Sequence, residues 1–283
     1  MTLPEWMDAR KLSIRRRIGG GLFQIVNYLT VAAVLLMLVA ILFELIKGSL
    51  PAWHWSTLVT VSQGLGGGLA NALIGTLWLS LLTLLLVVPL GLATATFLTM
   101  YAPSSLRELT LLISDVLAGV PSIVFGYVGY IGFVIAFGWG FSASAAALTL
   151  SMMVLPYMIR NAQIALNQIP QQLSEQAVAL GFTRARMTIS ILWPSARRGI
   201  TSGAILAIAI AMGETAPLIY TANWSQNLPT LALTHHSVGY LTYVVWTYVQ
   251  QPYPAAVALA YMAGLILIGL IAVMAILGRL ARR

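Results

Sequence analysis

Long apolar runs alternate with short polar segments along the chain. Six runs approach or exceed the roughly 20 apolar residues that one membrane-spanning helix needs: residues 21–46, 69–100, 109–137, 143–159, 200–221 and 255–277. The second and third runs are longer than one crossing, and each contains a proline, Pro89 or Pro121. A kink, a tilt or a broken helix is expected there. The pattern predicts an all-α integral membrane protein with six transmembrane helices.

Composition agrees with this prediction. Hydrophobic residues make up 59% of the 283 residues and charged residues 8%, far from the balance of a soluble domain. The chain contains no cysteine, which excludes disulfides and thiol-ligated metals. We expect a basic N-terminus at residues 1–20 and a single transmembrane domain at residues 21–283. The first apolar run lacks the small-residue cleavage site of a signal peptide, so it is expected to stay in the mature chain.

The basic residues set the orientation. Every Lys and Arg except Lys47 falls in a segment on one side of the predicted spans: Arg10, Lys11, Arg15, Arg16, Arg17, Arg107, Arg160, Arg184, Arg186, Arg197, Arg198, Arg279, Arg282 and Arg283. The positive-inside rule places that side, and therefore both termini, in the cytoplasm. The net charge of +8 is explained by topology, without a nucleic-acid partner.

The largest cytoplasmic connection, residues 160–199, has the signals of two short helices. Pro170 suits the first turn of one helix and Gly181 its end. Thr183 can cap a second helix, which is expected to stop before Pro194. This predicts an ordered helical coupling loop between the fourth and fifth spans.

The first of these short helices is amphipathic. Leu173, Ala177 and Leu180 share one face, while Glu175 and its polar neighbours lie elsewhere. Such a segment has two plausible uses, to lie on the lipid surface or to dock into a groove of a soluble partner.

The spacing of this loop resembles the cytoplasmic loop of ABC importer permeases, in which a Glu-Ala-Ala pattern is followed by Gly and then by Ile-x-Leu-Pro. The chain has "EQAVALG" and, nine residues later, "ILWP". The matching residues are Glu175, Ala177, Gly181, Ile191 and Pro194, and the departures are Gln176 and Trp193. The resemblance implies that Leu173, Glu175, Ala177, Leu180 and Gly181 couple the membrane domain to an ATPase, with a bend at Gly181.

Two further stretches narrow the resemblance. "AGVPSIVFG" at residues 118–126 and "GETAPL" at residues 213–218 are similar to the permease subunits of phosphate importers, and "LPAWHW" and "GTLWLSLLTLLLVVPLG" extend the similarity over nearly the whole chain. The resemblance implies a bacterial inner-membrane importer with a second permease subunit, cytoplasmic ATP-binding subunits and an extracytoplasmic phosphate-binding protein. It implies no enzyme activity and no cofactor on this chain. The chain indeed lacks a G-x-x-x-x-G-K-[ST] phosphate loop.

Glu214 is an acidic residue inside an apolar run, where a carboxylate costs about 2.5–3.5 kcal/mol. It continues a stripe of small residues, Gly199, Gly203, Ala207 and Ala211, which permits a close helix contact. It is therefore expected to face protein or a cavity. Three interpretations stay open: a structural hydrogen bond, a place on the translocation pathway, or no role.

A carboxylate on a phosphate pathway needs a compensating cation. Many permeases of this family carry an Arg about one turn before the Glu, but here that position is Ile210. We expect Glu214 to pair with an Arg of a partner permease, which requires a heterodimer. The predicted pathway or subunit-pairing residues are Gly119, Pro121, Ser122, Glu214, Thr215 and Pro217.

The backbone around these residues has weak points. Pro121 and Pro217 each deprive the carbonyl four residues earlier of its helical partner, and such backbone is tolerated at membrane depth where it lines a cavity. At Pro121 a packing kink is the alternative. His235 and His236 are adjacent and lack a carboxylate in their loop, so no metal site is predicted.

Other classes of function remain to be weighed. An ABC permease for another oxyanion or small solute differs from the first interpretation in substrate alone. A secondary transporter or channel would leave the docking loop without a partner and lacks an evident inverted repeat. A membrane enzyme would need paired carboxylates, a nucleophile with a base, or a metal cluster within the bundle.

Overall fold

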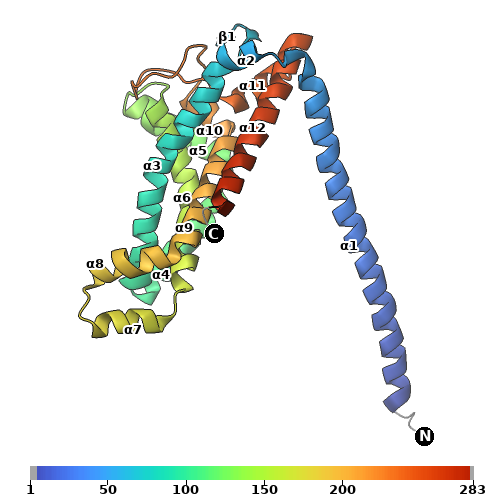
Figure 1. Ribbon diagram of the computed structural model, residues 1–283, viewed down its shortest axis with the longest axis vertical. Coiled ribbons are helices and arrows are strands. Elements are labelled where there is room, and N and C mark those ends of the chain that lie inside the picture. Colours follow the sequence, from blue (N-terminus) through green and yellow to red (C-terminus); the bar gives the residue numbers. More distant parts are fainter. Residues whose placement is uncertain (1–4, 281–283) are drawn as a thin grey trace. The chain divides into compact units, whose positions relative to one another are not determined.

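The computed structural model describes the backbone of residues 5–280 and the side chains of residues 23–280. The chain is almost entirely helical (Figure 1). The elements are α1 (Glu5–Ser49), η1 (Leu50–Ala52), α2 (Trp55–Val59), β1 (Ser62–Gln63), β2 (Gly66–Gly67), α3 (Ala70–Met100), α4 (Ser104–Ala118), α5 (Ser122–Gly129), η2 (Tyr130–Ala136), α6 (Ala143–Asn167), α7 (Gln171–Ala179), α8 (Arg184–Met187), η3 (Thr188–Leu192), α9 (Trp193–Gly213), α10 (Ala216–Thr221), α11 (Leu241–Tyr248) and α12 (Pro254–Leu280). The segments η2 and η3 are π-helices.

The chain divides into two units at Gly48 and Ser49. The first unit consists of α1, which contains most of a candidate membrane span. The second unit carries the remaining elements. The predicted basic N-terminus at residues 1–20, and Arg282 and Arg283, lie outside the described side chains.

Helix α6 is the centre of the second unit. It packs against α3, α4, α5 and α9, and two thirds of its apolar window is buried. Its sequence explains this position, because Ala145, Ala146 and Ala147 allow neighbouring helices to approach closely. The hydroxyls of Thr149 and Ser151 donate to carbonyls four residues earlier in the same helix, so no polar group is left unsatisfied by their burial.

A second, smaller core lies at the end of this unit where α3 begins (Figure 1). It joins α11 and α12 to the segment before α3. The strands β1 and β2 form a hairpin there, with Ser62 paired with Gly67. Asn71 holds the hairpin, since its side chain accepts from the Ser62 N–H at 3.0 Å and donates to the Ser225 carbonyl at 2.8 Å. This hairpin is a small addition to the predicted all-α fold.

The helical loop at the opposite end of this unit, which we call the elbow, comprises residues 168–192. Helix α7 follows Pro170 and ends before Gly181, which has a φ of +77°. The Thr183 hydroxyl accepts from the Arg186 N–H and caps α8. The ends of α7 at Pro170 and Gly181 and the cap at Thr183 were predicted from the sequence. The elbow is shorter than residues 160–199, because α6 continues to Asn167 and α9 begins at Trp193.

The expected stop before Pro194 is wrong. Helix α8 passes through the π-helix η3 into α9, and Pro194 lies in the first turn of α9. A proline removes the helical partner of the carbonyl four residues earlier, here that of Ser190. A wider π-turn at that place allows the chain to stay helical.

The described residues contain four helices that are long and apolar enough to cross a membrane, or five if the bent pair formed by α4 and α5–η2 counts as one span. The pair is bent by 98°, so the predicted third span, residues 109–137, is not one continuous helix. The predicted fifth span, residues 200–221, is interrupted after Gly213. A multi-pass membrane protein is therefore established, while the six-span count stays a prediction.

Candidate functional site: two broken helices that meet at Glu214

Glu214 lies at the break between α9 and α10. Its backbone is extended, with φ −76° and ψ 137°, and α10 begins two residues later at Ala216. Pro217 occupies the first turn of α10, where the missing N–H is tolerated, although the same residue could not continue α9. Glu214 is half-buried and Gly213 is exposed. The carboxyl group therefore reaches a surface of this unit and is not enclosed in its core.

Ser122 lies at a second break, between α4 and α5. Gly119 is the C-cap of α4, Pro121 is the N-cap of α5, and Ser122 is the first residue of α5. The Ser122 hydroxyl lies close to the Glu214 carboxyl group. The fold thus brings together two of the stretches on which the sequence-based prediction rested.

Gly126 makes this meeting of α5 and α10 close. A Cβ atom at Gly126 would lie 2.9 Å from the Pro217 Cα and 3.1 Å from the Ala216 carbonyl oxygen. Real Cβ contacts are longer than this, so only glycine allows the two backbones to pack directly. Gly126 ends the stretch "AGVPSIVFG", but sequence reasoning did not select it as a site residue.

Thr242, also missed from the sequence, supports the break from a third side. Its hydroxyl donates to the backbone carbonyl of Glu214 at 2.7 Å. Thr242 belongs to α11, and α11 is attached to α3 because the Leu241 N–H donates to the Thr76 hydroxyl at 2.9 Å. The Glu214 backbone is therefore held by the same helix that is anchored to the bundle.

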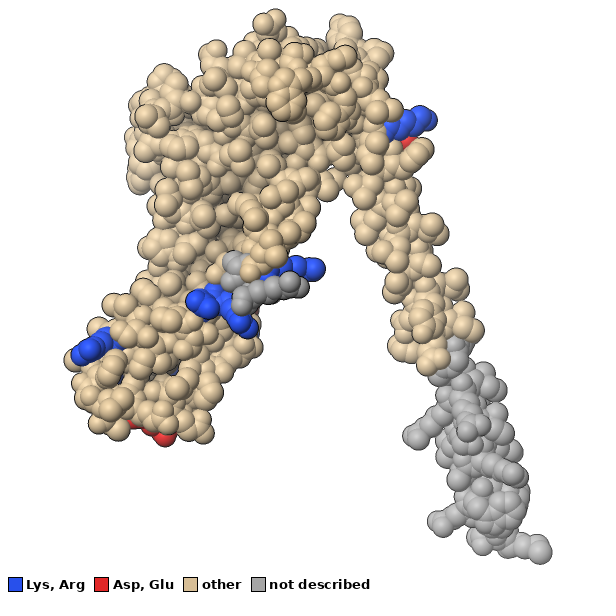
Figure 2. All heavy atoms as spheres, in the orientation of Figure 1, with Lys and Arg blue, Asp and Glu red and all other residues tan. Residues whose placement is uncertain are grey.

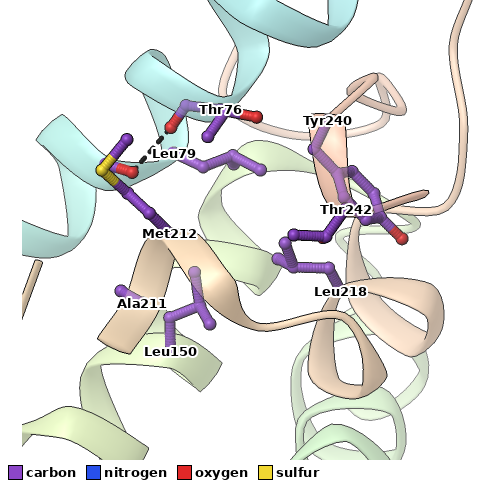
Figure 3. A pocket seen from close by; sticks show the side chains of 9 residues that line it. Thr76, Leu79, Leu150, Ala211, Met212, Leu218, Tyr240 and Thr242 are labelled. Carbon is purple, nitrogen blue, oxygen red and sulfur yellow. Dashed lines mark hydrogen bonds between the residues drawn. The ribbon is translucent and has the colours of Figure 1, made fainter. Parts of the chain in front are cut away.

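A small cavity lies beside this break (Figure 3). Its volume of about 10 Å³ corresponds to the space of a single water molecule. The Ser80 hydroxyl on its wall already donates to the Thr76 carbonyl. The lining residues come from α3, α6, α9, α10 and the segment around α11: Thr76, Leu79, Ser80, Leu150, Ala211, Met212, Leu218, Tyr240 and Thr242. This space is too small for an oxyanion, so any pathway in this conformation lies on the exposed side of Glu214.

The stripe of small residues before Glu214 packs within the chain. A Cβ at Gly199 would lie within contact of Ala165, and one at Gly203 would lie 2.7 Å from the Asn161 Cβ. Both neighbours belong to α6, so the stripe brings α9 onto α6 as expected for such a pattern. Ile210, at the place of the family's arginine, packs against the main core.

Glu214 is set apart from the other charged residues of the second unit. The remaining described charges lie on α4, in the lower part of α6, in the elbow, at the start of α9 and at the end of α12. On the face drawn in Figure 2 the basic side chains of this unit gather at the elbow end. No described Lys or Arg of this unit contacts Glu214, so compensation for its charge is not supplied by these residues.

The elbow residues have unequal exposure. Ala177 is buried, with 1% of its surface exposed, and it packs into the main core with Met187 and Leu192. Leu180 is 76% exposed and Leu173 38% exposed. The residues predicted to share one face of α7 therefore differ in their surroundings. Ala177 holds α7 on the bundle, while Leu180 and Glu175 are available to a partner.

The described residues contain no group of three or more His, Cys, Asp or Glu side chains that could hold a metal ion.

Residues 87–283 match the family described as binding-protein-dependent transport system inner membrane component. The chain belongs to this family. The permease is 40% identical to "Phosphate transport system permease protein PstA 2" of Mycobacterium tuberculosis (strain CDC 1551 / Oshkosh), over 96% of this chain and 90% of that protein. It is 36% identical to the phosphate transport system permease protein PstA of Xylella fastidiosa (strain 9a5c), over 71% and 70% of the two chains.

A solved structure shares the fold of the permease. The MetNI methionine ABC transporter, in an inward-facing conformation, matches with a TM-score of 0.64 over 76% of this chain and 94% of that chain. Sequence identity is 19%, so this likeness concerns the fold alone. The structure therefore shares the fold of a chain of that transporter.

Proposed function

We infer that this permease is the membrane subunit of a binding-protein-dependent ABC importer that moves inorganic phosphate inward across the bacterial inner membrane. The observation that carries this inference is 40% identity over 96% of the chain to a phosphate transport system permease. The site supports it, because a carboxyl group beside broken helix ends is a polar surface at membrane depth, where irregular backbone is tolerated only when it lines a cavity or is buried in protein.

We propose that six segments cross the membrane, with both termini in the cytoplasm. Helices α1, α3, α6 and α12 each supply one span, and the shorter pairs α5–η2 and α9–α10 supply the other two. The gathering of the described basic residues at the elbow end supports this orientation under the positive-inside rule. Residues 1–20 are then a cytoplasmic extension and residues 21–283 a single domain.

The proposed assembly contains a second permease subunit, cytoplasmic ATP-binding subunits and an extracytoplasmic phosphate-binding protein. ATP hydrolysis takes place on the partner subunits, since this chain has no phosphate loop. We propose that it needs no cofactor or metal of its own. Gly119, Pro121, Ser122, Glu214, Thr215 and Pro217 form the proposed pathway or subunit-pairing site, with an arginine of a different permease subunit as the partner of Glu214.

The elbow is the proposed contact with the ATP-binding subunits. Leu173, Glu175 and Leu180 are exposed there, Ala177 fixes α7 to the bundle, and Gly181 makes the turn with a φ of +77°. Gly181→Asp places a charged side chain at a turn that favours glycine and on the proposed contact surface with the ATP-binding subunits. Phosphate uptake should be lost at normal membrane abundance. Gly132→Ala is the matched control, because a Cβ there meets no atom within 4 Å, and unchanged uptake in Gly181→Asp would contradict the elbow proposal.

The function is tested by uptake of radiolabelled phosphate at limiting concentration. Cells that lack this chain and all other phosphate importers are compared with the same cells carrying it, with excess arsenate, sulfate or molybdate as competitor. We expect restored uptake that arsenate blocks most strongly. Restored uptake of a different oxyanion, or no restored uptake of phosphate, would assign the permease to another solute.

A further inference from the structure

An open groove lies at the inner end of the bundle, where three elements meet. Its volume is about 290 Å³, and it is lined by the end of α6, the start of α7 and the start of α9. The lining residues are Ala165, Gln168, Ile169, Pro170, Leu173, Ser195, Ala196, Arg198 and Gly199. No carboxylate is among them. The wall is therefore part apolar and part polar, with one cationic side chain.

Arg198 differs from the arginines of the elbow and of α4 in having no partner. Arg107 donates to the Leu98 carbonyl at 2.8 Å, and the guanidiniums of Arg184 and Arg186 lie over the rings of Tyr101 and Phe182. Among the described residues, by contrast, no carboxylate, carbonyl or ring contacts the Arg198 guanidinium. Its charge is free to bind an anion from outside the chain.

In the proposed topology the groove lies at the level of the inner membrane surface. Helix α6, a candidate span, ends at Asn167 beside it, and the apolar part of α9 begins directly after Arg198 and Gly199. A basic residue at this boundary meets the phosphate groups of the lipids, and basic pockets between helices on the cytoplasmic side bind anionic headgroups. The apolar residues Ile169 and Leu173 offer a surface to an acyl chain in the same groove.

We propose that this groove binds an anionic phospholipid of the inner leaflet, with the headgroup phosphate at Arg198 and an acyl chain along Ile169 and Leu173. The size and lining of the groove favour a lipid over free inorganic phosphate. A water molecule needs about 10–15 Å³ of such space, so a single small ion would leave most of the groove and its apolar wall unfilled. The proposal holds whichever solute the importer carries.

A lipid in this position would contact moving parts of the permease. Pro170 and Leu173 belong to the start of the elbow, while Ser195 and Ala196 belong to the start of α9. One bound molecule would bridge these two segments at the membrane surface. Its presence would limit how far the elbow can separate from α9, and so the lipid is an attachment of the elbow to the bilayer.

The test uses the complete transporter, purified with its partner subunits and placed in phosphatidylethanolamine vesicles that contain a photoactivatable phosphatidylglycerol. After illumination, mass spectrometry measures labelling of the peptides that contain residues 165–173 and 195–199. We expect labelling that unlabelled phosphatidylglycerol removes and phosphatidylcholine does not. Arg198→Gln should lower it about fivefold, the factor that one basic side chain contributes at an anionic membrane surface.

Arg197→Gln is the matched control. It removes the same charge from the neighbouring residue, whose side chain is exposed and does not line the groove. It should keep most of the labelling. Equal loss in the two variants, equal labelling by a phosphatidylcholine probe, or no labelling would overturn the proposal. Competition by millimolar inorganic phosphate inside the vesicles would assign the groove to the free ion. Labelling that appears only after the ATP-binding subunits are removed would assign the groove to a protein contact.

Discussion

Pro89 and Pro156 lie inside helices that remain continuous, whereas Pro121 and Pro217 lie where helices are broken. The prolines of α3 and α6 are surrounded by apolar residues, in "LLVVPLG" and "MVLPYM". Pro121 and Pro217 instead follow a glycine within four residues, and Glu214 and Thr215 precede Pro217. Proline weakens a helix by about 3 kcal/mol, and glycine adds to that cost.

The comparison shows which features accompany a proline at which a helix is broken. At Pro156 the surrounding helices bury the irregularity, since α6 is the most buried of the candidate spans. At Pro121 and Pro217 the helices are interrupted, and the two helix starts that follow, α5 and α10, pack against each other with Ser122 close to Glu214. Proline alone does not predict a break in a helix, whereas both breaks in this chain have a glycine before the proline and a polar residue beside it.

The largest effect on phosphate uptake is expected at Glu214, the acidic residue beside Pro217. Glu214→Gln replaces the carboxyl group that lies beside Ser122 and that is the proposed partner of an arginine of a second permease subunit. Hydrogen bonds to charged groups are worth about 1.5–3 kcal/mol, so phosphate uptake should fall about 10- to 100-fold. Glu108→Gln, an exposed carboxylate on α4, should leave uptake unchanged. Similar uptake in wild type and Glu214→Gln would mean that the broken helices do not carry the function.

The contact between the two breaks is tested at Gly126. A methyl group there would push against the Pro217 backbone, and overpacking of this kind costs about 1–3 kcal/mol. Gly126→Ala should reduce uptake and lower the melting temperature of the detergent-purified complex. The same change at Gly132 in η2 meets open space, so its melting temperature should match that of the wild type. A stable, active Gly126→Ala protein would argue that α5 and α10 can separate without loss.

The two classes of proline are compared directly by Pro217→Ala and Pro156→Ala. Alanine at residue 217 restores an N–H that can donate to the Gly213 carbonyl, which favours joining α9 and α10 into one helix. Uptake should then fall several-fold while the complex stays stable. Pro156→Ala in the continuous helix should preserve uptake. Loss of uptake in both variants, or in neither, would remove the distinction between the two classes.

The smallest effect is expected at Thr242. Thr242→Val keeps the shape of the side chain and loses the hydrogen bond to the Glu214 carbonyl. A net hydrogen bond contributes about 0.5–1.5 kcal/mol, so uptake should change only a few-fold. Thr242→Ser retains the hydroxyl and should behave as the wild type. A Thr242→Ser protein as impaired as Thr242→Val would show that packing, and not the hydrogen bond, matters there.

Signals within a few residues were read correctly from the sequence. Pro170, Gly181 and Thr183 fix the ends of the elbow helices through local backbone and capping preferences, and these preferences do not depend on the rest of the fold. The stripe before Glu214 likewise predicted a close helix contact. Its partner, α6, could not be named, since any helix would satisfy the same pattern.

Contacts between distant segments were not predictable. The donation from Thr242 to Glu214 depends on α11, a helix inside a stretch that the apolar pattern left unassigned. The burial of Ala177 depends on where α8 lies. A kink, a tilt or a broken helix at Pro121 was expected from the sequence, but the 98° angle of the break was not. The π-turn before Pro194 was missed because a proline normally indicates the end of a helix.

The π-turn η3 joins α8 to α9 without a break in the helical chain from Arg184 to Gly213. A π-turn and a proline are common places for a helix to bend, and η3 and Pro194 lie between the elbow and Glu214. Beyond this bend point, the close contact of Gly203 with α6 fixes the position of α9. A movement of the elbow can therefore be taken up as a change of angle at η3, while the part of α9 that carries Glu214 stays attached to α6.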